Sequence, residues 1–179
     1  MKDFEVIDDV ISIGYQNRIK DYMCGSNFPW YYMNAITHGS TEELKDSDPY
    51  SGFSHVVYEP NNIGKGADTL YPVLLEGLNN KEPTALLRIR AAMFVKNQNN
   101  SKHHVPHVDR TDDPEPYKVA IYYVMDSDGS TGIFKGNELV AEVNPKKGRL
   151  LIMDGDVYHA SQCPKKYDQR IVVNYNFRI

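Results

Sequence analysis

The segment Arg170 to Phe177 reads RIVVNYNF, and the alternation of its side chains decides how the chain folds. Neighbouring side chains of a β-strand point to opposite faces of a sheet, so this segment has two different faces. One face carries the apolar residues Ile171, Val173, Tyr175 and Phe177, and we expect helices from the first half of the chain to bury it. The other face carries Arg170, Val172, Asn174 and Asn176, and it either lines a cavity or meets solvent.

Short strand-like segments with turn residues between them follow one another from Thr84 onward. The candidates are Leu86 to Val95, His104 to Asp109, Tyr117 to Met125, Thr131 to Lys135, Leu139 to Val143, Arg149 to Met153, Val157 to Gln162 and Arg170 to Phe177. Turn signals such as Asp128-Gly129 and Lys147-Gly148 separate them. This succession predicts a mainly β fold, a sandwich or a jelly roll.

The first half of the chain predicts helices and further strands. Ser12 to Met23 predicts a helix with Tyr15, Ile19, Tyr22 and Met23 on one side, and Gly25 ends it. Asp68 is the expected N-cap of a second helix, which carries Leu70, Val73, Leu74 and Leu78 on one stripe and ends near Gly77 to Asn80. The aromatic run Phe28 to Tyr32, leading into Ala35 to His38, and the segment Phe53 to Tyr58 predict strands, while Thr41 to Tyr50 predicts a polar loop. We expect one domain over residues 1–179, in which residues 1–83 support a jelly-roll core at residues 84–179.

Composition limits the compartment and the partners. The chain of 179 residues is 41% hydrophobic, which is enough for one substantial core. Its formal net charge of -4 gives no overall attraction to nucleic acid or to anionic membranes. No apolar stretch has the length of a membrane helix, and acidic residues stand where a signal peptide has basic ones. Only Cys24 and Cys163 are present, and we expect both to be reduced thiols of a soluble cytoplasmic protein with no nucleic-acid or membrane partner.

The tripeptide His107-Val108-Asp109 predicts a metal site. On an extended segment His107 and Asp109 point to the same side and can bind one ion. His159 follows fifty residues after Asp109, on a predicted strand. Two imidazoles and one carboxylate leave coordination positions open for substrate and oxygen, and they are the ligand set of non-haem Fe(II) oxygenases. We therefore expect His107, Asp109 and His159 to be metal ligands and catalytic residues.

Arg170 follows His159 by eleven residues, across a turn near Pro164-Lys165. If the two strands form a symmetrical hairpin, His159 and Arg170 face each other on one side of a sheet, with Cβ atoms roughly 5 Å apart. The guanidinium would then reach the far end of a diacid bound to the metal.

These residues, in this order, resemble the motif of the Fe(II)- and 2-oxoglutarate-dependent dioxygenases, specifically their prolyl 4-hydroxylase-like branch. The resemblance covers roughly Leu86 to Phe177 and implies a double-stranded β-helix, the cupin-like jelly roll. The family's HxD, distal His and basic residue on the last strand correspond to His107, Asp109, His159 and Arg170. The resemblance also implies that Tyr123, in the strand VAIYYV, helps to hold the distal carboxylate of the co-substrate, whereas the alternative role for Tyr123 is an aromatic core residue. Asn174, on the strand face of Arg170, is our candidate for a further residue beside the co-substrate.

The resemblance implies a reaction as well. The 2-oxo and C1 carboxylate oxygens of 2-oxoglutarate would chelate Fe(II), while the C5 carboxylate pairs with Arg170. O2 would take the remaining position, and the reaction would release succinate and CO2 as it hydroxylates a C–H bond. Related halogenases lack the carboxylate ligand, so the presence of Asp109 disfavours halogenation.

Further polar residues near the motif leave alternatives open. We expect His103 and His104 at a loop or strand edge and not as ligands. Arg88 and Arg90 either add positive charge to the cavity or lie on a wet face, and Asn176 shares this ambiguity, whereas Met93 and Phe94 are expected in the core. The charged turn Thr111 to Glu115 is either a solvated loop or part of the site entrance.

The substrate is expected to be a peptidyl side chain or a small molecule. The segments expected to select it are the loops Gly39 to Ser51, Asn61 to Gly66 and Val95 to Lys102, which carry no recognisable signature. The alternative to catalysis is a cupin-like metal-binding or scaffold module. Three ligands are fewer than the four of most structural metal sites, and this alternative leaves an inward Arg170 without an anionic partner.

Overall fold

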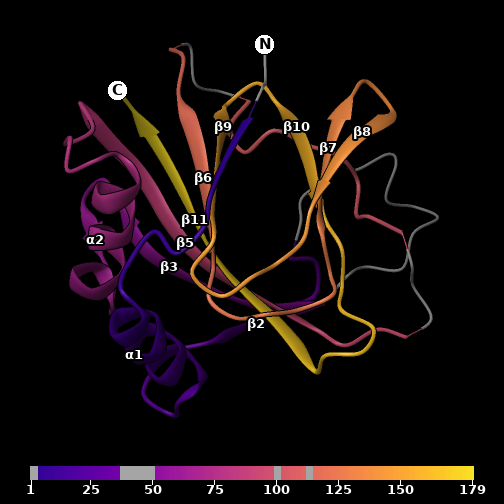
Figure 1. The fold of residues 1–179 in the computed structure, drawn as a ribbon, viewed down its shortest axis with the longest axis horizontal. Coiled ribbons are helices and arrows are strands. Elements are labelled where there is room, and N and C mark those ends of the chain that lie inside the picture. The colour runs from indigo at the N-terminus through magenta and orange to yellow at the C-terminus, as the bar shows by residue number, and fades with distance from the viewer. Residues whose placement is uncertain (1–3, 37–50, 99–101, 112–114) are drawn as a thin grey trace.

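Two antiparallel sheets facing each other form the body of the molecule (Figure 1). The structure is a computed structural model that describes residues 4–36, 51–98, 102–111 and 115–179. Within these residues an eight-stranded sheet has the order β1-β9-β6-β11-β5-β3-β2, with β4 paired to β3, and a three-stranded sheet has the order β10-β7-β8. Two helices lie on the outer side of the larger sheet. This is the expected mainly β jelly roll with flanking helices.

Most of the expected strands are present. In chain order the elements are β1 (Phe4–Ile7), α1 (Ile13–Cys24), β2 (Tyr31–Met33), β3 (Gly52–Glu59), β4 (Asn62–Ile63), α2 (Ala67–Gly77), β5 (Ala85–Val95), β6 (Lys118–Tyr123), β7 (Thr131–Lys135), β8 (Glu138–Val143), β9 (Leu150–Asp154), β10 (Tyr158–Ser161) and β11 (Gln169–Arg178). The expected strand at His104 to Asp109 is reduced to an isolated antiparallel bridge between His107 and His159. The short strands β1 and β4 were not expected from the sequence.

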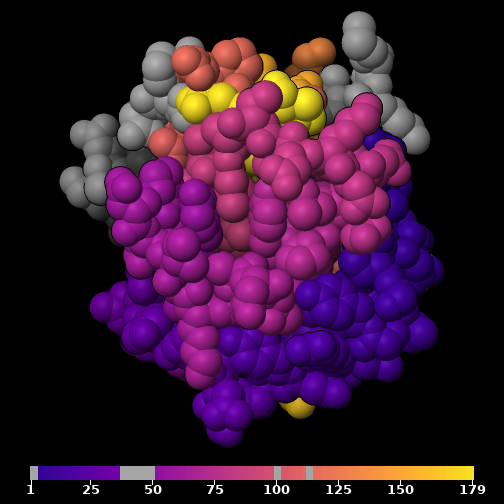
Figure 2. Space-filling view, turned by 90° about the vertical axis from the view of Figure 1, so that its left-hand side faces the viewer, coloured from indigo at the N-terminus to yellow at the C-terminus, as the bar shows by residue number. Residues whose placement is uncertain are grey.

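The strand β11 lies in the middle of the larger sheet, between β5 and β6, and its two faces divide the core. The apolar face packs against α1 and α2 through Ile19, Met23, Leu70 and Leu74, as the alternation predicted. Figure 2 views this helical side and shows mainly residues from the first half of the chain, with the C-terminal residues visible chiefly at the upper edge. Burial of this apolar face under the helices stabilises β11 in the sheet.

The helix α1 begins and ends where the sequence predicts. The Ser12 hydroxyl accepts a hydrogen bond from the Tyr15 backbone N–H at 3.4 Å, and Gly25 is the C-cap. Ile19 and Met23 are fully buried, and Tyr15 and Tyr22 pack against the same cluster. The expected apolar side of this helix is confirmed.

The expectation that Asp68 caps α2 is wrong. Gly66 is the N-cap, with a φ of 95° that a residue without a side chain adopts freely, and no side chain caps this helix. Asp68 lies in the first turn instead, where its negative charge is favourable beside the helix N-terminus. The stripe of Leu70, Val73 and Leu74 is buried as expected, and the helix ends at Gly77.

Strands from both parts of the chain share the larger sheet. β1 pairs with β9, and β3 pairs with β5, so residues 1–83 add strands as well as helices. The division of the domain at residue 83 therefore stays a prediction. Ala35 and Ile36, where a strand was expected, are not strand, because β2 ends at Met33. Parts of several expected segments lie outside the described residues. They are residues 37 and 38 of the expected strand, the expected polar loop at 41–50, most of the expected loop at 39–51, and residues 99–101 and 112–114 of two other expected loops.

The expected hairpin between His159 and Arg170 is also wrong. β10 pairs with β7 in the smaller sheet, whereas β11 pairs with β5 and β6 in the larger sheet. The segment between the two strands crosses from one sheet to the other, so His159 and Arg170 come from facing sheets and are not cross-strand partners. A turn in a sequence of strands leaves open which sheet the next strand joins, and jelly rolls alternate between two sheets.

None of the helices in the described part of the chain has the length and apolar character needed to cross a membrane.

Candidate metal centre

The HxD segment is held in place by hydrogen bonds to β10. The backbone N–H of His107 donates to the carbonyl of His159 at 3.0 Å, and that of His159 donates to the carbonyl of His107 at 3.0 Å. The N–H of His104 donates to the Ser161 carbonyl at 2.8 Å, so the segment lies extended beside the edge of the smaller sheet. The extended backbone brings residues 107 and 109 to the same side, as the spacing predicted.

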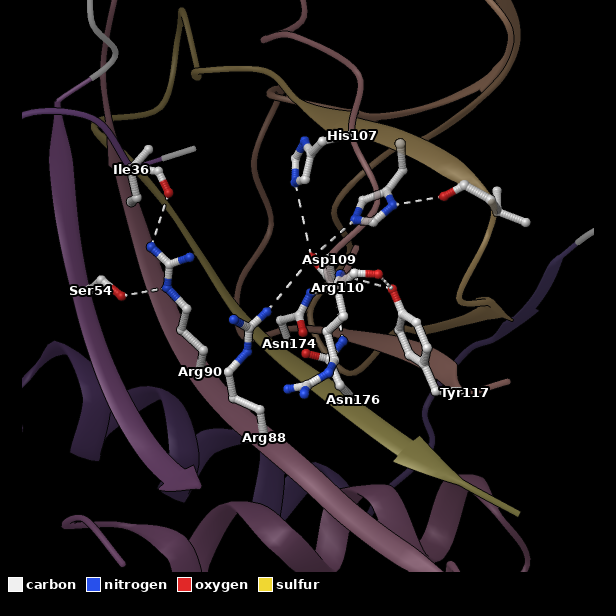
Figure 3. Close-up of polar contacts among 12 residues, drawn as sticks. Ile36, Ser54, Arg88, Arg90, His107, Asp109, Arg110, Tyr117, Asn174 and Asn176 are labelled. Atoms are coloured by element: carbon white, nitrogen blue, oxygen red, sulfur yellow. Dashed lines mark hydrogen bonds and ion pairs between the residues drawn. The ribbon is translucent and has the colours of Figure 1, made fainter. Parts of the chain in front are cut away.

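His107, Asp109 and His159 converge on one point. Figure 3 shows the His107 ring pointing toward Asp109. Their candidate ligand atoms all lie within 4.8 Å of one another. The Oδ1 atom of Asp109 is 3.7 Å from His159 Nε2 and 4.0 Å from His107 Nε2, and the centres of the two imidazole rings are 4.9 Å apart. Two imidazoles and one carboxylate at one point fit a divalent transition metal that keeps open positions.

Backbone carbonyls fix the tautomers of both histidines. The Nδ1 atom of His107 lies 3.1 Å from the carbonyl oxygen of Val105, and Nδ1 of His159 lies 3.1 Å from that of Val157. A carbonyl only accepts hydrogen bonds, so each Nδ1 carries the proton and each Nε2 lone pair is left for the ion. Burial, followed by the neighbouring His159, lowers the pKa of His107, which favours the neutral form that binds metals.

Two amides hold the carboxylate of Asp109. The Nδ2 atoms of Asn174 and Asn176 donate to Oδ2 at 2.9 and 2.7 Å, which leaves Oδ1 facing the histidines. Burial alone would raise the pKa of Asp109, but electrostatic interactions with His159, Arg88 and His107 and the amide of Asn174 lower it to about 2. The carboxylate is therefore ionised at neutral pH. The sequence had favoured Asn174 over Asn176, whereas the structure brings both to Asp109.

The polar face of β11 lines a cavity, and the register of its neighbours defines the floor. Arg170, Val172, Asn174 and Asn176 lie opposite Phe94, Ala92, Arg90 and Arg88 of β5, in that order. Val172 and Asn174 also face Tyr123 and Ile121 of β6. The cavity has a volume of about 120 Å³, and its lining combines the metal triad with this floor: Ile36, Arg88, Arg90, Ala92, Phe94, His107, Val108, Asp109, Ile121, His159, Ser161, Arg170, Val172 and Asn174. The solvent-facing alternative for this strand face is thereby excluded.

Arg170 is a buried cation with open donors. The residue is 1% exposed, and its Nη2 donates to Thr131 Oγ1 at 2.7 Å, while Nε and Nη1 have no partner among the described residues. The guanidinium carbon lies 5.0 Å from the centre of the Phe94 ring and 5.8 Å from that of Tyr123. Burial lowers the pKa of Arg170. An anion in this cavity would find two unused N–H donors.

Tyr123 lies beside Arg170 and shares its partner. Tyr123 is fully buried, and its hydroxyl donates to Thr131 Oγ1 at 2.8 Å. Thr131 was not among the candidates, although it shares a face of β7 with the buried Ile133, and that alternation could have identified it as an inward residue. Tyr123 belongs to a buried hydrophobic cluster, so its alternative role as a core residue is observed, and a co-substrate role stays a prediction.

Arg88 and Arg90 lie on the cavity side of β5 and not on a wet face (Figure 3). Arg90 Nε donates to Ser54 Oγ at 2.7 Å, and its Nη2 donates to the Ile36 carbonyl at 2.9 Å. Arg88 Nη2 is 3.8 Å from Asp109 Oδ1. The first of the two alternatives, positive charge added to the cavity, is therefore the observed one.

The two remaining histidines of the segment stay apart from the triad. His103 Nε2 lies 2.9 Å from Ser130 Oγ and 3.3 Å from a carboxylate oxygen of Glu142. His104 is buried, and its Nε2 lies 3.5 Å from Cys163 Sγ. Burial, followed by the charge of Arg170, lowers the pKa of His104 to about 3. As expected, neither belongs to the group of potential ligands that the described residues form.

Solved structures share this fold, although no protein-family model and no curated protein sequence matches the chain. An oxidoreductase of the 2OG-Fe(II) oxygenase family from Burkholderia pseudomallei has a TM-score of 0.70 at 10% identity, over 98% of this chain and 85% of that chain. A prolyl hydroxylase from Trichoplax adhaerens, in complex with a hypoxia inducible factor peptide, has a TM-score of 0.66 at 11% identity, over 99% and 84%. HygX from Streptomyces hygroscopicus, with nickel and 2-oxoglutarate bound, has a TM-score of 0.62 at 14% identity, over 98% and 82%. At the level of the fold, these similarities confirm the expected double-stranded β-helix and the resemblance to 2OG-Fe(II) oxygenases and prolyl hydroxylases.

Proposed function

We propose that the chain is an Fe(II)- and 2-oxoglutarate-dependent oxygenase that hydroxylates a C–H bond and releases succinate and CO2. The observation that carries this proposal is the pairing of two features in one cavity. A set of two histidines and one carboxylate lines this cavity, and so does a fully buried arginine with two open donors. The fold shared with 2OG-Fe(II) oxygenases adds support.

His107, Asp109 and His159 would hold the iron. Their donor set fits because both Nε2 atoms present lone pairs and the Asp109 carboxylate is ionised. A bound Fe(II) would supply the activation of O2 that is coupled to the oxidative decarboxylation of 2-oxoglutarate. Asn174 and Asn176 would keep the Asp109 carboxylate oriented, since both donate to the oxygen that faces away from the histidines.

Arg170 would bind the distal carboxylate of 2-oxoglutarate. Its Nε and Nη1 atoms offer two charge-assisted hydrogen bonds, and Thr131 holds the guanidinium in place through Nη2. Tyr123 would complete this end of the site beside Thr131, and Asn174 would lie beside the co-substrate. The apolar side chains of Val172 and Ile121, between the two ends, would exclude water from the bound co-substrate.

The hydroxylated group would belong to a peptidyl side chain or to a small molecule. Both kinds of ligand are bound in similar folds, since the Trichoplax prolyl hydroxylase holds a peptide and HygX has been solved with hygromycin B. We place the reaction in the cytoplasm, which the two free thiols Cys24 and Cys163 support.

An anaerobic titration of the iron-loaded protein with 2-oxoglutarate tests the proposal. The expected result is a metal-to-ligand charge-transfer band in the visible region, followed by succinate formation after oxygen is admitted. Iron binding without the band and without succinate would overturn the oxygenase and favour the cupin-like metal-binding module. Arg170→Ala is the matched variant, because it should lose the band at concentrations of 2-oxoglutarate that saturate the wild type while it keeps the iron.

A further inference from the structure

Two arginines lie at the end of the cavity floor that the co-substrate would not use. Arg170 pairs in register with Phe94 of β5, while Arg88 and Arg90 come six and four residues earlier on the same strand. Along a strand these offsets correspond to roughly 20 and 13 Å between backbone positions. A five-carbon diacid that joins the metal to Arg170 extends away from Arg88 and Arg90.

Among the described residues, neither arginine pairs with a carboxylate other than that of Asp109. The two hydrogen bonds of Arg90 go to neutral acceptors, the Ser54 hydroxyl and the Ile36 carbonyl. Arg88 has a buried Nε with no partner among the described residues, and its ion pair is with Asp109, at 3.8 Å. Asp109 is the proposed ligand of the metal, so its charge is shared with the ion. Cations that are partly buried without an anion carry an electrostatic cost that a bound anion would remove.

The charges of the described residues that line the cavity do not balance, even after the proposed ligands are added. The cations would be a divalent ion and the guanidiniums of Arg88, Arg90 and Arg170. The anions would be Asp109, which is the one acidic residue among the described lining residues, and the two carboxylates of 2-oxoglutarate. Two positive charges are left, and both belong to the end of the floor where Arg88 and Arg90 lie.

The two arginines at this end of the cavity also line a second, larger groove. The groove has a volume of about 780 Å³, and Arg88 and Arg90 line both the groove and the metal cavity. Its other lining residues include the cation Lys65 and the exposed Tyr31, and the one acid among them is Glu59. A molecule lying in this groove would meet the two guanidiniums at the point where it approaches the metal triad.

We propose that the substrate is an acid whose carboxylate binds Arg88 and Arg90, and that this contact places the neighbouring C–H bond at the metal. The proposal rests on the oxygenase function proposed above and specifies its substrate class. The two arginines are positioning residues for the substrate. An acidic substrate of this kind supplies the negative charge that the metal, the co-substrate and Asp109 leave uncompensated.

Calorimetric binding with matched acids and amides tests the proposal without turnover. The protein is loaded with Zn²⁺, which has no redox chemistry, and saturated with 2-oxoglutarate so that the Arg170 end is filled. The probes are N-acetyl-aspartate amide against N-acetyl-asparagine amide, for an acidic residue, and 3-phenylpropionate against 3-phenylpropionamide, for a small acid. The wild type should bind the acid of at least one pair about 10- to 100-fold more tightly, as one charge-assisted contact implies. The pair that shows the preference identifies the source of the carboxylate.

The variants separate recognition from folding. Arg88→Gln and Arg90→Gln should each reduce the preference for the acid to less than about threefold. Arg90→Lys should keep part of the preference, because the charge remains. The control variant Arg18→Gln, on the exposed side of α1, should keep all of it. Equal binding of acid and amide in both pairs, or a preference that survives Arg88→Gln and Arg90→Gln, overturns the proposal. Failure of 2-oxoglutarate to bind the Zn²⁺ form would instead overturn the oxygenase function, and the first titration detects it separately.

Discussion

Replacement of Arg170 by methionine should have two effects of opposite sign. Arg170 is buried with one hydrogen bond to Thr131 and with two donors that have no partner among the described residues. Methionine fills a similar volume without charge. We expect Arg170→Met to make the ligand-free protein more stable and to abolish tight binding of 2-oxoglutarate.

The size of both effects follows from the surroundings of the guanidinium. Replacing buried ionic groups by apolar ones of similar volume stabilises proteins by up to about 1–4 kcal/mol. Lost contacts with the Phe94 and Tyr123 rings offset about 0.5–2 kcal/mol of this. The midpoints of the two ranges leave a net gain of about 1 kcal/mol, which corresponds to a rise in Tm of roughly 2–4 °C for a chain of this length. Truncation of one partner of a buried charge pair costs about 2–5 kcal/mol, so 2-oxoglutarate affinity should fall about 30- to several thousand-fold.

Thermal unfolding of the metal-free protein and calorimetric titration of the Zn²⁺ form with 2-oxoglutarate measure the two effects. Arg149→Met is the control, because Arg149 pairs with Asp8 at the surface and lies outside the described lining of the cavity. It should lower the stability slightly and leave 2-oxoglutarate affinity unchanged. The reasoning is refuted if Arg170→Met destabilises the ligand-free protein by more than about 1 kcal/mol and still binds 2-oxoglutarate normally, because Arg170 would then support the fold.

Three further predictions concern the metal, the pH and the packing. Asn174→Ala or Asn176→Ala should weaken Zn²⁺ binding about 10- to 100-fold in calorimetry, since each removes a hydrogen bond that orients Asp109, and unchanged affinity would contradict this role. Hydrogen bonds from Arg149, then Lys146, lower the pKa of Asp8 from 3.8 to about 2. Their contribution to the stability of the folded protein is therefore complete above pH 3.8 and is lost as the pH falls through 2. In urea unfolding, the free energy of unfolding of Asp8→Asn should therefore depend less on pH between pH 4 and 2 than that of the wild type. The two proteins should differ by less than about 1 kcal/mol over this range, because the ion pair is exposed. Identical slopes would show that the pair contributes nothing to stability. Gly77→Ala should destabilise the protein by about 1–3 kcal/mol and lower its Tm, because a Cβ at this position would clash with Leu150. Gly14→Ala, in α1, has open space around the new Cβ and should not lower the Tm. Equal Tm values for the two variants would contradict the packing at Gly77.

The parts of the fold that could be predicted are those that one strand or one helix decides alone. The alternation of Arg170 to Phe177 separates a core face from a cavity face, and the spacing of His107 and Asp109 brings two ligands to one side. Ser12 and Gly25 act within one turn of α1. Each of these features depends on local backbone geometry, which the sequence carries directly.

The parts that could not be predicted depend on which strands become neighbours. The error over the hairpin of His159 and Arg170 arose because a turn does not determine which sheet the next strand joins. Thr131 reaches Arg170 only because β7 of the smaller sheet faces β11 of the larger one. Asn174 and Asn176 share a strand face, and the approach of Asp109 from a separate segment decides that both contact it.

Sheet pairing also gives the two proposed acid sites of the cavity different surroundings. Arg170 is paired with Phe94 and is enclosed by Thr131 and Tyr123, so an anion there must enter a closed, largely apolar end. Arg88 and Arg90 lie further along the same floor, where the groove begins, and an anion there can remain part of a larger molecule. At both places a guanidinium would favour a negatively charged ligand. The space around the guanidinium would limit the size of the ligand that can bind. Asp109, between the two ends, is the proposed metal ligand, so its two amide partners and its ionised state would matter for either of the proposed acids.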